Sequence, residues 1–224
     1  MPDWRGVEPS ELVETWAPKA PKPRALVLGA GGGGDALWLA KSGFEVDAVE
    51  RDPARARMRI EEPLKGSITV HVEDLATYPI PPDRYGLVVA LAVFHFVVPS
   101  RLRLAAPGIE AGLCRGGLLL VQVLSTDDPG LHAMKQAGAD EVEPNTFYIS
   151  ELGGIIHFFE ADELRVLFGG LEELVLERYR WAKAADDEGF GAGMILVGRR
   201  PAKSGPQAAE AAKGADSLRE ESGG

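Results

Sequence analysis

The chain has 224 residues, of which 45% are hydrophobic and 26% charged, and its formal net charge is −10. This length and composition are typical of one globular domain, and the acidic balance disfavours a broad nucleic-acid surface, which requires a basic face. The only cysteine, Cys114, excludes an internal disulfide and fits a reducing compartment. Residues 1–16 carry no apolar signal segment, and no apolar run reaches the roughly 18 residues that span a bilayer. We expect a cytoplasmic protein that binds neither nucleic acid nor membrane.

Short apolar runs alternate with amphipathic stretches along most of the chain. The first stretch, residues 8–17, predicts a short N-terminal helix. Strands are expected over residues 25–29, 44–50, 67–74, 85–94 and 116–124, and helices over residues 35–43, 52–62, 99–114 and 160–170. Strands that alternate with helices in this way predict an α/β protein with a parallel, doubly wound sheet and helices on both faces.

Two of these helices carry proline signals. Asp52 followed by Pro53 marks the start of the helix over 52–62, because an aspartate N-cap and a proline in the first turn favour helix initiation. Pro107 lies inside the stretch 99–114, where the missing backbone donor predicts a kink or a break.

The carboxyl-terminal part breaks the alternation. Two strand-like runs, residues 172–181 and 192–200, are separated by a charged, glycine-rich loop. With no helix between them, they are expected to pair antiparallel as a hairpin. Residues 201–224 lack aromatic and β-branched side chains, so we expect a disordered tail there, with a short helix over 206–213 as the alternative. A single domain is therefore expected over residues 1–200.

The junction of the first strand with the following helix carries five glycines in six positions. Gly29, Gly31 and Gly34 satisfy the dinucleotide pattern G-x-G-x-x-G, whereas Gly29, Gly31 and Gly33 satisfy the G-x-G-x-G turn of adenosylmethionine-binding enzymes. Glu50 ends the second strand at the distance of about 20 residues where a carboxylate can hold a ribose. The pair predicts an adenosine-type ligand without separating the two cofactors; a simple tight turn is the alternative.

The other motifs resemble those of the class I S-adenosylmethionine-dependent methyltransferases, over about residues 25–199. "ALVLGAGGGGDALWLAKSGFEVDAVERDP" is similar to their first two motifs, "VEDLATYPIPPDRYGLVVALAVFHFV" to the next two, and "LCRGGLLLV" to the start of their fifth strand. The stretch 145–180 is similar to tellurite-resistance-type methyltransferases. The resemblance implies a Rossmann-like, mostly parallel seven-stranded sheet that ends in an antiparallel hairpin. It also implies methyl transfer to a small-molecule acceptor such as a thiol or a chalcogen oxyanion.

The resemblance implies roles in binding the cofactor S-adenosyl-L-methionine for residues at the ends of the first four strands. The implied set comprises Gly29, Ala30, Gly31 and Gly33 at the methionine part, Glu50 at the ribose, Arg51, Asp74 and Leu75 at the adenine, and Leu91 and Ala92 beside the sulfonium. For Asp74, a turn-forming role is the alternative.

Candidate acceptor-side groups lie further along the chain. His95 is a candidate base or polar clamp, and its alternative is a packed histidine; His157 is a second catalytic candidate. Arg165 can neutralise an anion, although a surface role fits its helix better. The residues that are expected to shape access are Trp16, in a lid or a packing helix, and Met134, Phe147 and Tyr148. The four histidines show no zinc spacing, so no metal is expected.

Two positions depart from the pattern of this superfamily. Val27 stands where an acid usually lies two residues before the first glycine, and Gly86 stands where an aspartate often follows the aromatic residue that begins the fourth strand, here Tyr85. These departures keep a non-catalytic, cofactor-binding homologue as one alternative. An NAD(P)-dependent Rossmann oxidoreductase is the other, although the chain has no Y-x-x-x-K pattern.

Overall fold

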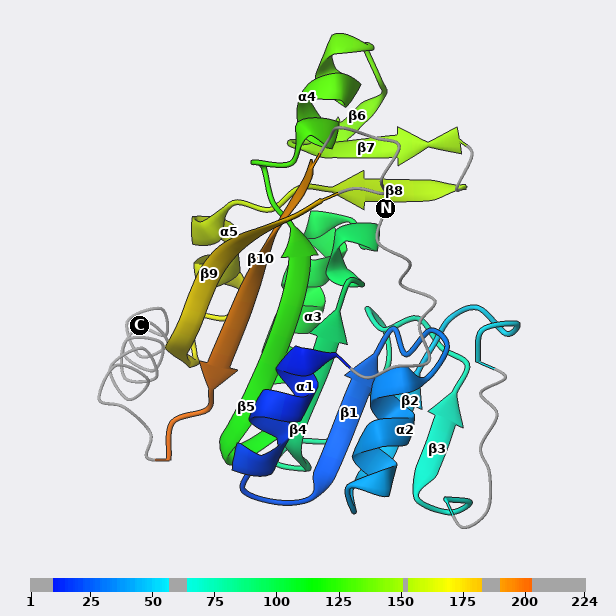
Figure 1. The fold of residues 1–224 in the computed structure, drawn as a ribbon, viewed down its shortest axis with the longest axis vertical. Helices are drawn as coiled ribbons and strands as arrows, with labels where there is room; N and C mark the ends of the chain where they lie inside the picture. Colours follow the sequence, from blue (N-terminus) through cyan, green and yellow to red (C-terminus); the bar gives the residue numbers. More distant parts are fainter. Residues whose placement is uncertain (1–9, 57–63, 151–152, 183–189, 203–224) are drawn as a thin grey trace, which may run out of the picture.

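The computed structural model describes residues 10–56, 64–150, 153–182 and 190–202, and its main feature is a seven-stranded sheet. The strands follow the order β3-β2-β1-β4-β5-β10-β9 (Figure 1). Their bounds are β1 (Arg24–Leu28), β2 (Glu45–Val49), β3 (Ile68–His71), β4 (Tyr85–Leu91), β5 (Leu113–Leu124), β9 (Glu172–Ala182) and β10 (Phe190–Arg199). The first five strands pair in parallel, and β10 pairs antiparallel with both β5 and β9. The predicted doubly wound sheet and its closing hairpin are confirmed.

Helices cover both faces of this sheet. The helical segments are α1 (Glu11–Trp16), η1 (Ala17–Lys19), α2 (Gly34–Lys41), η2 (Phe94–Phe96), α3 (Pro99–Gly112), α4 (Pro129–Gln136) and α5 (Ala161–Leu167). The helices α1 and α2 bury Val13 and Leu39 against one face of the sheet, whereas α3 and α5 bury Leu102 and Leu164 against the other. Each face thus has an apolar core of its own, as a parallel sheet requires.

A second, smaller sheet was not anticipated from the sequence. It consists of β6 (Glu141–Glu143), β7 (Thr146–Ile149) and β8 (Gly154–His157), which pair antiparallel. Together with α4 it encloses a small core of Leu131, Phe147, Ile156 and Phe158. Figure 1 shows this insertion standing beyond the carboxyl ends of β4 and β5. It therefore lies at the edge of the main sheet where open α/β proteins bind their ligands.

Several predicted elements differ from the structure in extent or regularity. Of the helix expected over 52–62, residues 52–56 form a turn in which Asp52 Oδ1 accepts from the Ala54 N–H at 2.8 Å, and the following residues lie outside the described ranges. The helix α3 runs through Pro107 without a break, because Ala106 and Ile109 anchor that turn in the core. The fourth strand ends at Leu91 instead of residue 94, since a short 3₁₀ turn follows it.

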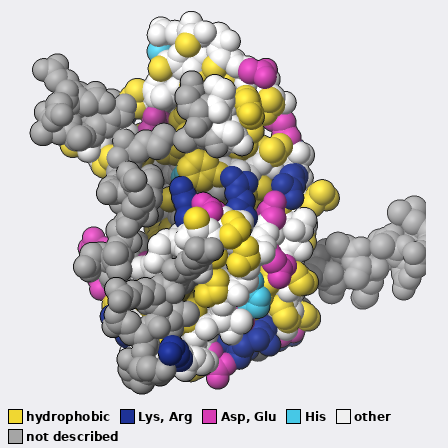
Figure 2. All heavy atoms as spheres, turned by 90° about the vertical axis from the view of Figure 1, so that its right-hand side faces the viewer, with side chains coloured by type: hydrophobic (Ala, Val, Ile, Leu, Met, Phe, Trp, Pro, Cys, Tyr) yellow, Lys and Arg dark blue, Asp and Glu magenta, His cyan; other side chains and the backbone are white. Residues whose placement is uncertain are grey.

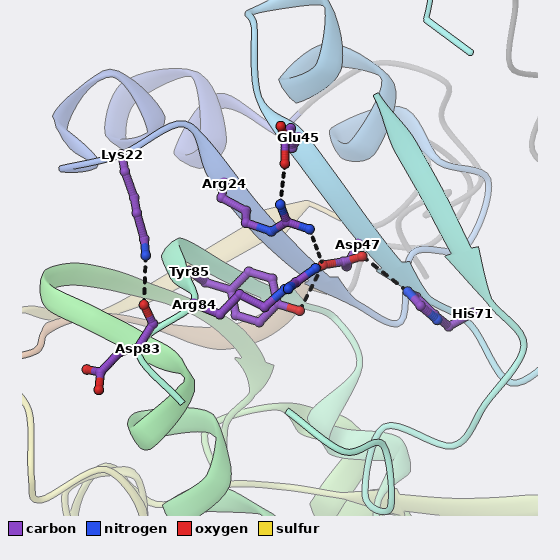
Figure 3. Close-up of polar contacts among 8 residues, drawn as sticks. All are labelled: Lys22, Arg24, Glu45, Asp47, His71, Asp83, Arg84 and Tyr85. Carbon is purple, nitrogen blue, oxygen red and sulfur yellow. Dashed lines mark hydrogen bonds and ion pairs between the residues drawn. The ribbon is translucent and has the colours of Figure 1, made fainter. Parts of the chain in front are cut away.

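A cluster of polar and charged groups surrounds the buried Asp47 in the middle of β2 (Figure 3). Asp47 Oδ2 accepts from the Tyr85 hydroxyl at 2.9 Å and lies 3.5 Å from Arg24 Nη2 and 3.4 Å from Arg84 Nε. Its Oδ1 lies 3.2 Å from His71 Nε2. Burial raises the pKa of Asp47, but the bonds from His71 and Tyr85 and the charges of the two arginines outweigh it and lower the pKa below its usual value. The cluster thus joins groups on or beside β1, β2, β3 and β4.

The surface is mixed in charge. On the face in Figure 2, basic and acidic side chains are interspersed among apolar ones. Within the described ranges, no helix combines the length and the apolar character needed to cross a membrane. The tail expected to be disordered falls almost entirely in residues 203–224, which lie outside those ranges.

Candidate functional site

The carboxyl ends of β1 to β4 meet at one edge of the sheet, because these strands are parallel neighbours. The glycine loop follows β1, Glu50 follows β2, Asp74 lies just beyond β3, and Ala92 follows β4. The sequence places these residues more than sixty positions apart at the extremes. The sheet therefore gathers at this edge the ends of all the segments that carry the predicted cofactor site.

The glycine loop needs glycine for two different physical reasons. Gly29, Gly31 and Gly33 have φ angles of +68°, +53° and +86°, a left-handed region that side chains disfavour. A Cβ on Gly29 would also lie 2.2 Å from Val93 Cγ2, so that position has no room for a side chain. A Cβ on Gly31 would meet, among the described atoms, only the Gly29 carbonyl oxygen at 3.9 Å. The backbone at Gly31 is thus a part of the loop that a ligand can approach.

Glu50 fastens this loop to the end of β2. Its side chain is buried, Oε2 accepts from the Gly31 N–H at 2.9 Å, and Oε1 accepts from the Asp52 N–H at 2.9 Å. Each carboxylate oxygen still has a lone pair for another donor. Val27, where the superfamily usually has an acid that orients the loop, is buried in the core. In this chain the carboxylate that orients the loop comes from the neighbouring strand.

The predicted adenine-side residues have mixed surroundings. Asp74 Oδ1 accepts from the Ala76 N–H at 2.9 Å, and its Oδ2 lies 3.0 Å from Arg101 Nη2. Asp74 therefore forms the turn that was the alternative interpretation of this residue, and its contact with adenine stays a prediction. The Leu75 side chain is buried in the core beneath this turn, whereas Arg51 is exposed.

The end of β4 has an unusual backbone. Ala92 has a φ of +53°, one of three positive values among the described non-glycine residues, and its N–H donates to the Gln122 carbonyl oxygen at 2.8 Å. Leu91, the last residue of the strand, is half-buried and packs against the core on the α1 side. A left-handed alanine costs energy that surrounding contacts must offset, and such residues concentrate at functional sites.

Three residues after Ala92, His95 lies almost fully buried with 2% of its surface exposed. Its Nδ1 has no hydrogen-bond partner in the part of the chain that the structure describes. Burial, and after it the charge of the nearby His157, lowers the pKa of His95 to about 3. The imidazole is therefore neutral at physiological pH and retains an unused polar atom.

His157 is equally buried, but both of its ring nitrogens are paired. Its Nδ1 lies 2.8 Å from Thr146 Oγ1, and its Nε2 lies 2.9 Å from Glu163 Oε2. These contacts join β8 to β7 and to α5. Of the two catalytic candidates, His95 is thus the one with capacity left for a ligand, whereas His157 holds the insertion against α5.

The remaining acceptor-side candidates have contacts within the protein. Arg165 lies on the surface, with Nε 3.0 Å from Glu173 Oε2 and Nη1 3.0 Å from Asp162 Oδ1. This agrees with the surface role and leaves its charge already neutralised. Trp16 packs against the core beside α2, with Lys19 Nζ 3.8 Å from its ring centroid, which favours the packing alternative over the lid.

Of the three residues in the insertion that were expected to shape substrate access, two pack inside the protein and one lies on the surface. Phe147 is buried in the core of the insertion and Met134 packs against it, so both support that small unit. Tyr148 is 47% exposed and leaves its ring on the surface. Two surface pockets of about 210 and 150 Å³ lie beside α5 and beside the turn after Asp74, and neither is lined by the glycine loop or His95. No cluster of potential metal ligands is present in the described ranges.

Sequence reasoning missed a polar and aromatic group at the same edge. Gln122 on β5 donates through Nε2 to the Tyr179 hydroxyl at 2.7 Å, and the rings of Tyr179 and Trp181 on β9 lie 5.4 Å apart between centroids. Gly191 and Gly193 of β10 lie directly opposite the two aromatic residues. The available signal was this alternation of glycines in one strand with aromatic residues in its partner.

The donor set at the edge fits the cofactor that the resemblance implies. A ribose offers two hydroxyl donors, and Glu50 presents a buried carboxylate with spare lone pairs. An amino-acid moiety needs close approach to the backbone, which Gly31 permits. The residues present therefore match an adenosine-type sulfonium ligand.

Comparisons with known proteins agree with this geometry. Residues 26–121 match the family described as a methyltransferase domain. A SAM-dependent methyltransferase from Methanosarcina mazei superposes with a TM-score of 0.68 at 15% identity, covering 88% of this chain and 100% of that one. TehB from Haemophilus influenzae reaches 0.64 at 18% identity, covering 85% and 62%. A comparison with curated proteins gives no match.

A third solved structure includes small molecules. The 1,6-didemethyltoxoflavin-N1-methyltransferase of Burkholderia thailandensis, with bound 1,6-didemethyltoxoflavin and S-adenosylhomocysteine, has a TM-score of 0.58 at 14% identity. The likeness covers 85% of this chain and 77% of that one. At these identities the structures show a shared fold, and they confirm the seven-stranded arrangement that the sequence predicted.

Proposed function

We propose that the chain is a class I S-adenosylmethionine-dependent methyltransferase and that its methyl acceptor is a small molecule; the matching methyltransferase domain over residues 26–121 and the shared fold support this. The observation that carries this function is the joining of the glycine loop to a buried acid, through the bond from Gly31 to Glu50. The sequence resemblance suggests thiols and chalcogen oxyanions as acceptors. The toxoflavin-type neighbour extends this choice to heterocycles.

When bound, S-adenosylmethionine supplies a methyl group activated by its positive sulfur. Our proposal is that the protein binds and orients this donor through the Gly31 backbone and the Glu50 carboxylate. Leu91 at the end of β4 and Ala92 after it lie beside the proposed position of the transferred methyl group. Transfer from a sulfonium disperses charge, so a dry and aligned site helps more than a strong acid. Such positioning can account for about 7–11 kcal/mol of the barrier in favourable cases.

His95 is assigned to the acceptor side. A histidine whose pKa is about 3 is too weak a base to remove a proton from a thiol or a hydroxyl near neutral pH. Its unpaired Nδ1 can instead form a hydrogen bond to the acceptor. Of the two roles considered for His95, the polar clamp is therefore favoured over the general base, and His157 becomes a positioning residue.

The topology disfavours the oxidoreductase alternative. The antiparallel β10 lies between β5 and β9, where a dinucleotide dehydrogenase usually continues with parallel strands. Val27 replaces the usual acid, and for this reason a non-catalytic homologue was an alternative. The contact of Glu50 with the loop can compensate for that missing acid. Neither alternative has an observation of its own in its favour.

Calorimetry with S-adenosylhomocysteine and with NADH tests the function directly. The purified protein should bind S-adenosylhomocysteine and not NADH, because the site is proposed to hold a sulfonium nucleoside. Transfer of a labelled methyl group to thiols, heterocycles and chalcogen oxyanions then tests turnover. Binding of NADH in its place would contradict the proposal, and cofactor binding without transfer to any acceptor would indicate the non-catalytic homologue.

A further inference from the structure

We propose that Gln122, Tyr179 and Trp181 form an aromatic platform that binds a planar, uncharged aromatic acceptor beside the end of β4. This inference rests on the proposed function, because it names the acceptor class of that same site. It excludes the oxyanions that the sequence resemblance implied and narrows the thiols to those that carry an aromatic ring. The argument starts from the position of Gln122.

Gln122 lies next to the proposed place of methyl transfer. In the sheet it pairs with Leu91, the last residue of β4, and its carbonyl oxygen accepts from the Ala92 N–H at 2.8 Å. Its side-chain amide donates to the Tyr179 hydroxyl at 2.7 Å. Gln122 therefore connects the Tyr179 hydroxyl to the end of β4.

The three side chains share one face of the sheet. Gln122 is the cross-strand partner of Ile195, and Tyr179 and Trp181 are the partners of Gly193 and Gly191. Because side chains alternate between the faces of a strand, residues 191, 193 and 195 lie on one side, and their partners lie there with them. Figure 1 shows β9 and β10 extending beyond the end of β5, so the platform reaches the ligand-binding edge.

The glycines of β10 let the rings lie against the strand. A Cβ on Gly191 would be 2.1 Å from Trp181 Cζ2, and a Cβ on Gly193 would be 2.7 Å from the Tyr179 hydroxyl oxygen. Any larger residue would therefore displace the rings. Both aromatic side chains are half-buried, and the angle between their ring planes is 33°. Rings that are held in this way offer a surface for stacking with a flat ligand.

The polar groups of the platform favour an uncharged ligand. Burial raises the pKa of Tyr179, although the bond from Gln122 opposes this, and the phenol therefore keeps its proton. Since its oxygen accepts from Gln122, its own O–H remains available to donate. On β9, Arg178, which precedes Tyr179, forms ion pairs with Asp127 and Glu160. The site thus presents aromatic surface and a neutral donor, which suit an aromatic ring that carries oxygen, nitrogen or sulfur.

A binding experiment with saturating S-adenosylhomocysteine tests the platform without requiring turnover. Calorimetry compares 2-naphthol, which is flat, with decahydro-2-naphthol, which has the same skeleton but puckered rings. The wild-type protein should bind 2-naphthol about tenfold more tightly, because a flat aromatic ring can stack on the two side chains and a puckered ring cannot. Equal binding of the two alcohols would overturn the inference, and this comparison needs no variant.

Variants locate the preference. Trp181→Ala should weaken 2-naphthol binding by about tenfold, and Gly191→Ala should do the same by displacing the ring, while Trp181→Phe retains most of the affinity. The matched control Leu104→Ala replaces an apolar residue on α3 that is 83% exposed and should leave binding unchanged. In all four variants, affinity for S-adenosylhomocysteine should stay within about twofold of wild type. An unchanged 2-naphthol affinity in folded Trp181→Ala would overturn the platform.

Kinetics provide a second measurement. The KM for phenylmethanethiol should be about tenfold below that for cyclohexylmethanethiol, and Trp181→Ala should remove this difference while changing kcat little. Preferential methylation of selenite or tellurite would overturn the inference and leave the proposed function intact. If the wild-type protein bound no S-adenosylhomocysteine, the proposed function itself would fail, and the platform with it.

Discussion

Two buried histidines near the end of β4 have opposite surroundings. His157 has a partner at each nitrogen, Thr146 and Glu163, whereas His95 Nδ1 has none in the described part of the chain. A buried polar atom without a hydrogen-bond partner lowers the stability of the folded protein, and a residue that serves only packing gains nothing that offsets this loss. We therefore propose that His95 Nδ1 forms its hydrogen bond with a ligand. His157 holds β8 of the insertion to β7 and α5.

The lowered pKa of His95 predicts how stability depends on pH. The folded-state pKa is about 3, below the usual value near 6.5, so between these values the unfolded chain binds a proton that the folded protein does not. Stability should therefore fall as the pH decreases through this window. From pH 7 to pH 5, His95 should lower the free energy of unfolding by about 2 kcal/mol. The variant His95→Gln should not show this loss.

Urea unfolding at pH 7 and at pH 5 measures this difference. His95→Gln keeps a hydrogen-bonding group at the position but cannot take up the proton. Parallel losses of stability in the wild-type protein and the variant would show that His95 is not the buried neutral group described here.

At the scale of elements, the glycine loop depends on a neighbouring strand. Glu50 at the end of β2 accepts from Gly31, and the N–H groups of Gly29 and Ala30 both donate to the Val49 carbonyl oxygen, at 2.8 and 3.0 Å. The loop is thus held by β2 as well as by its own conformation. This arrangement explains how the chain orients the loop with Val27 in place of the usual acid.

Glu50→Ala should weaken the binding of S-adenosylhomocysteine by more than about 1 kcal/mol. The substitution removes both the charge-assisted bonds expected to the ribose and the bond that holds Gly31. Calorimetry measures the change. Glu45→Ala, at the exposed first position of the same strand, is the matched control and should keep wild-type affinity. Undiminished binding by a folded Glu50→Ala protein would refute the ribose assignment.

At the scale of the whole molecule, the Asp47 cluster and the proposed cofactor site use different side chains of the same strands. The Asp47 cluster joins groups on or beside β1, β2, β3 and β4 (Figure 3), and the proposed cofactor site lies at the carboxyl ends of these strands. Because the carboxylate is buried among two arginines, a histidine and a tyrosine, its loss would leave these partners unsatisfied. We expect substitution of Asp47 to affect mainly stability and substitution of Glu50 to affect mainly cofactor binding.

Asp47→Asn should lower the free energy of unfolding by about 1–3 kcal/mol at pH 7 without changing affinity for S-adenosylhomocysteine. The pKa of Asp47 is lowered in the folded protein, so its contribution is present above the unfolded value near 3.9 and is lost as the pH falls further. The gap between variant and wild type in urea unfolding should accordingly narrow below pH 4. A constant gap, or a loss of cofactor affinity, would count against this separation.

Much of the main fold could be predicted from local patterns. The strand at Arg24–Leu28, the glycine loop and the final hairpin each depend on residues close together in the sequence, and each was found in the structure. The small sheet of the insertion was missed because its strands of three or four residues are too short to show a clear period. The unbroken α3 was missed because core packing on either side of Pro107 outweighs the local cost of proline.

The sequence by itself determined the succession of strands and helices along the chain, the glycine loop and the acid that follows the second strand. These features are encoded in neighbouring residues. Only the tertiary structure decided which distant groups meet. It paired His157 with Glu163, left His95 without a described partner, and brought Gln122 to Tyr179 across the intervening β10. The reason is physical: strand order and register set cross-strand contacts, and a periodic pattern in one segment carries no information about its neighbour in the sheet.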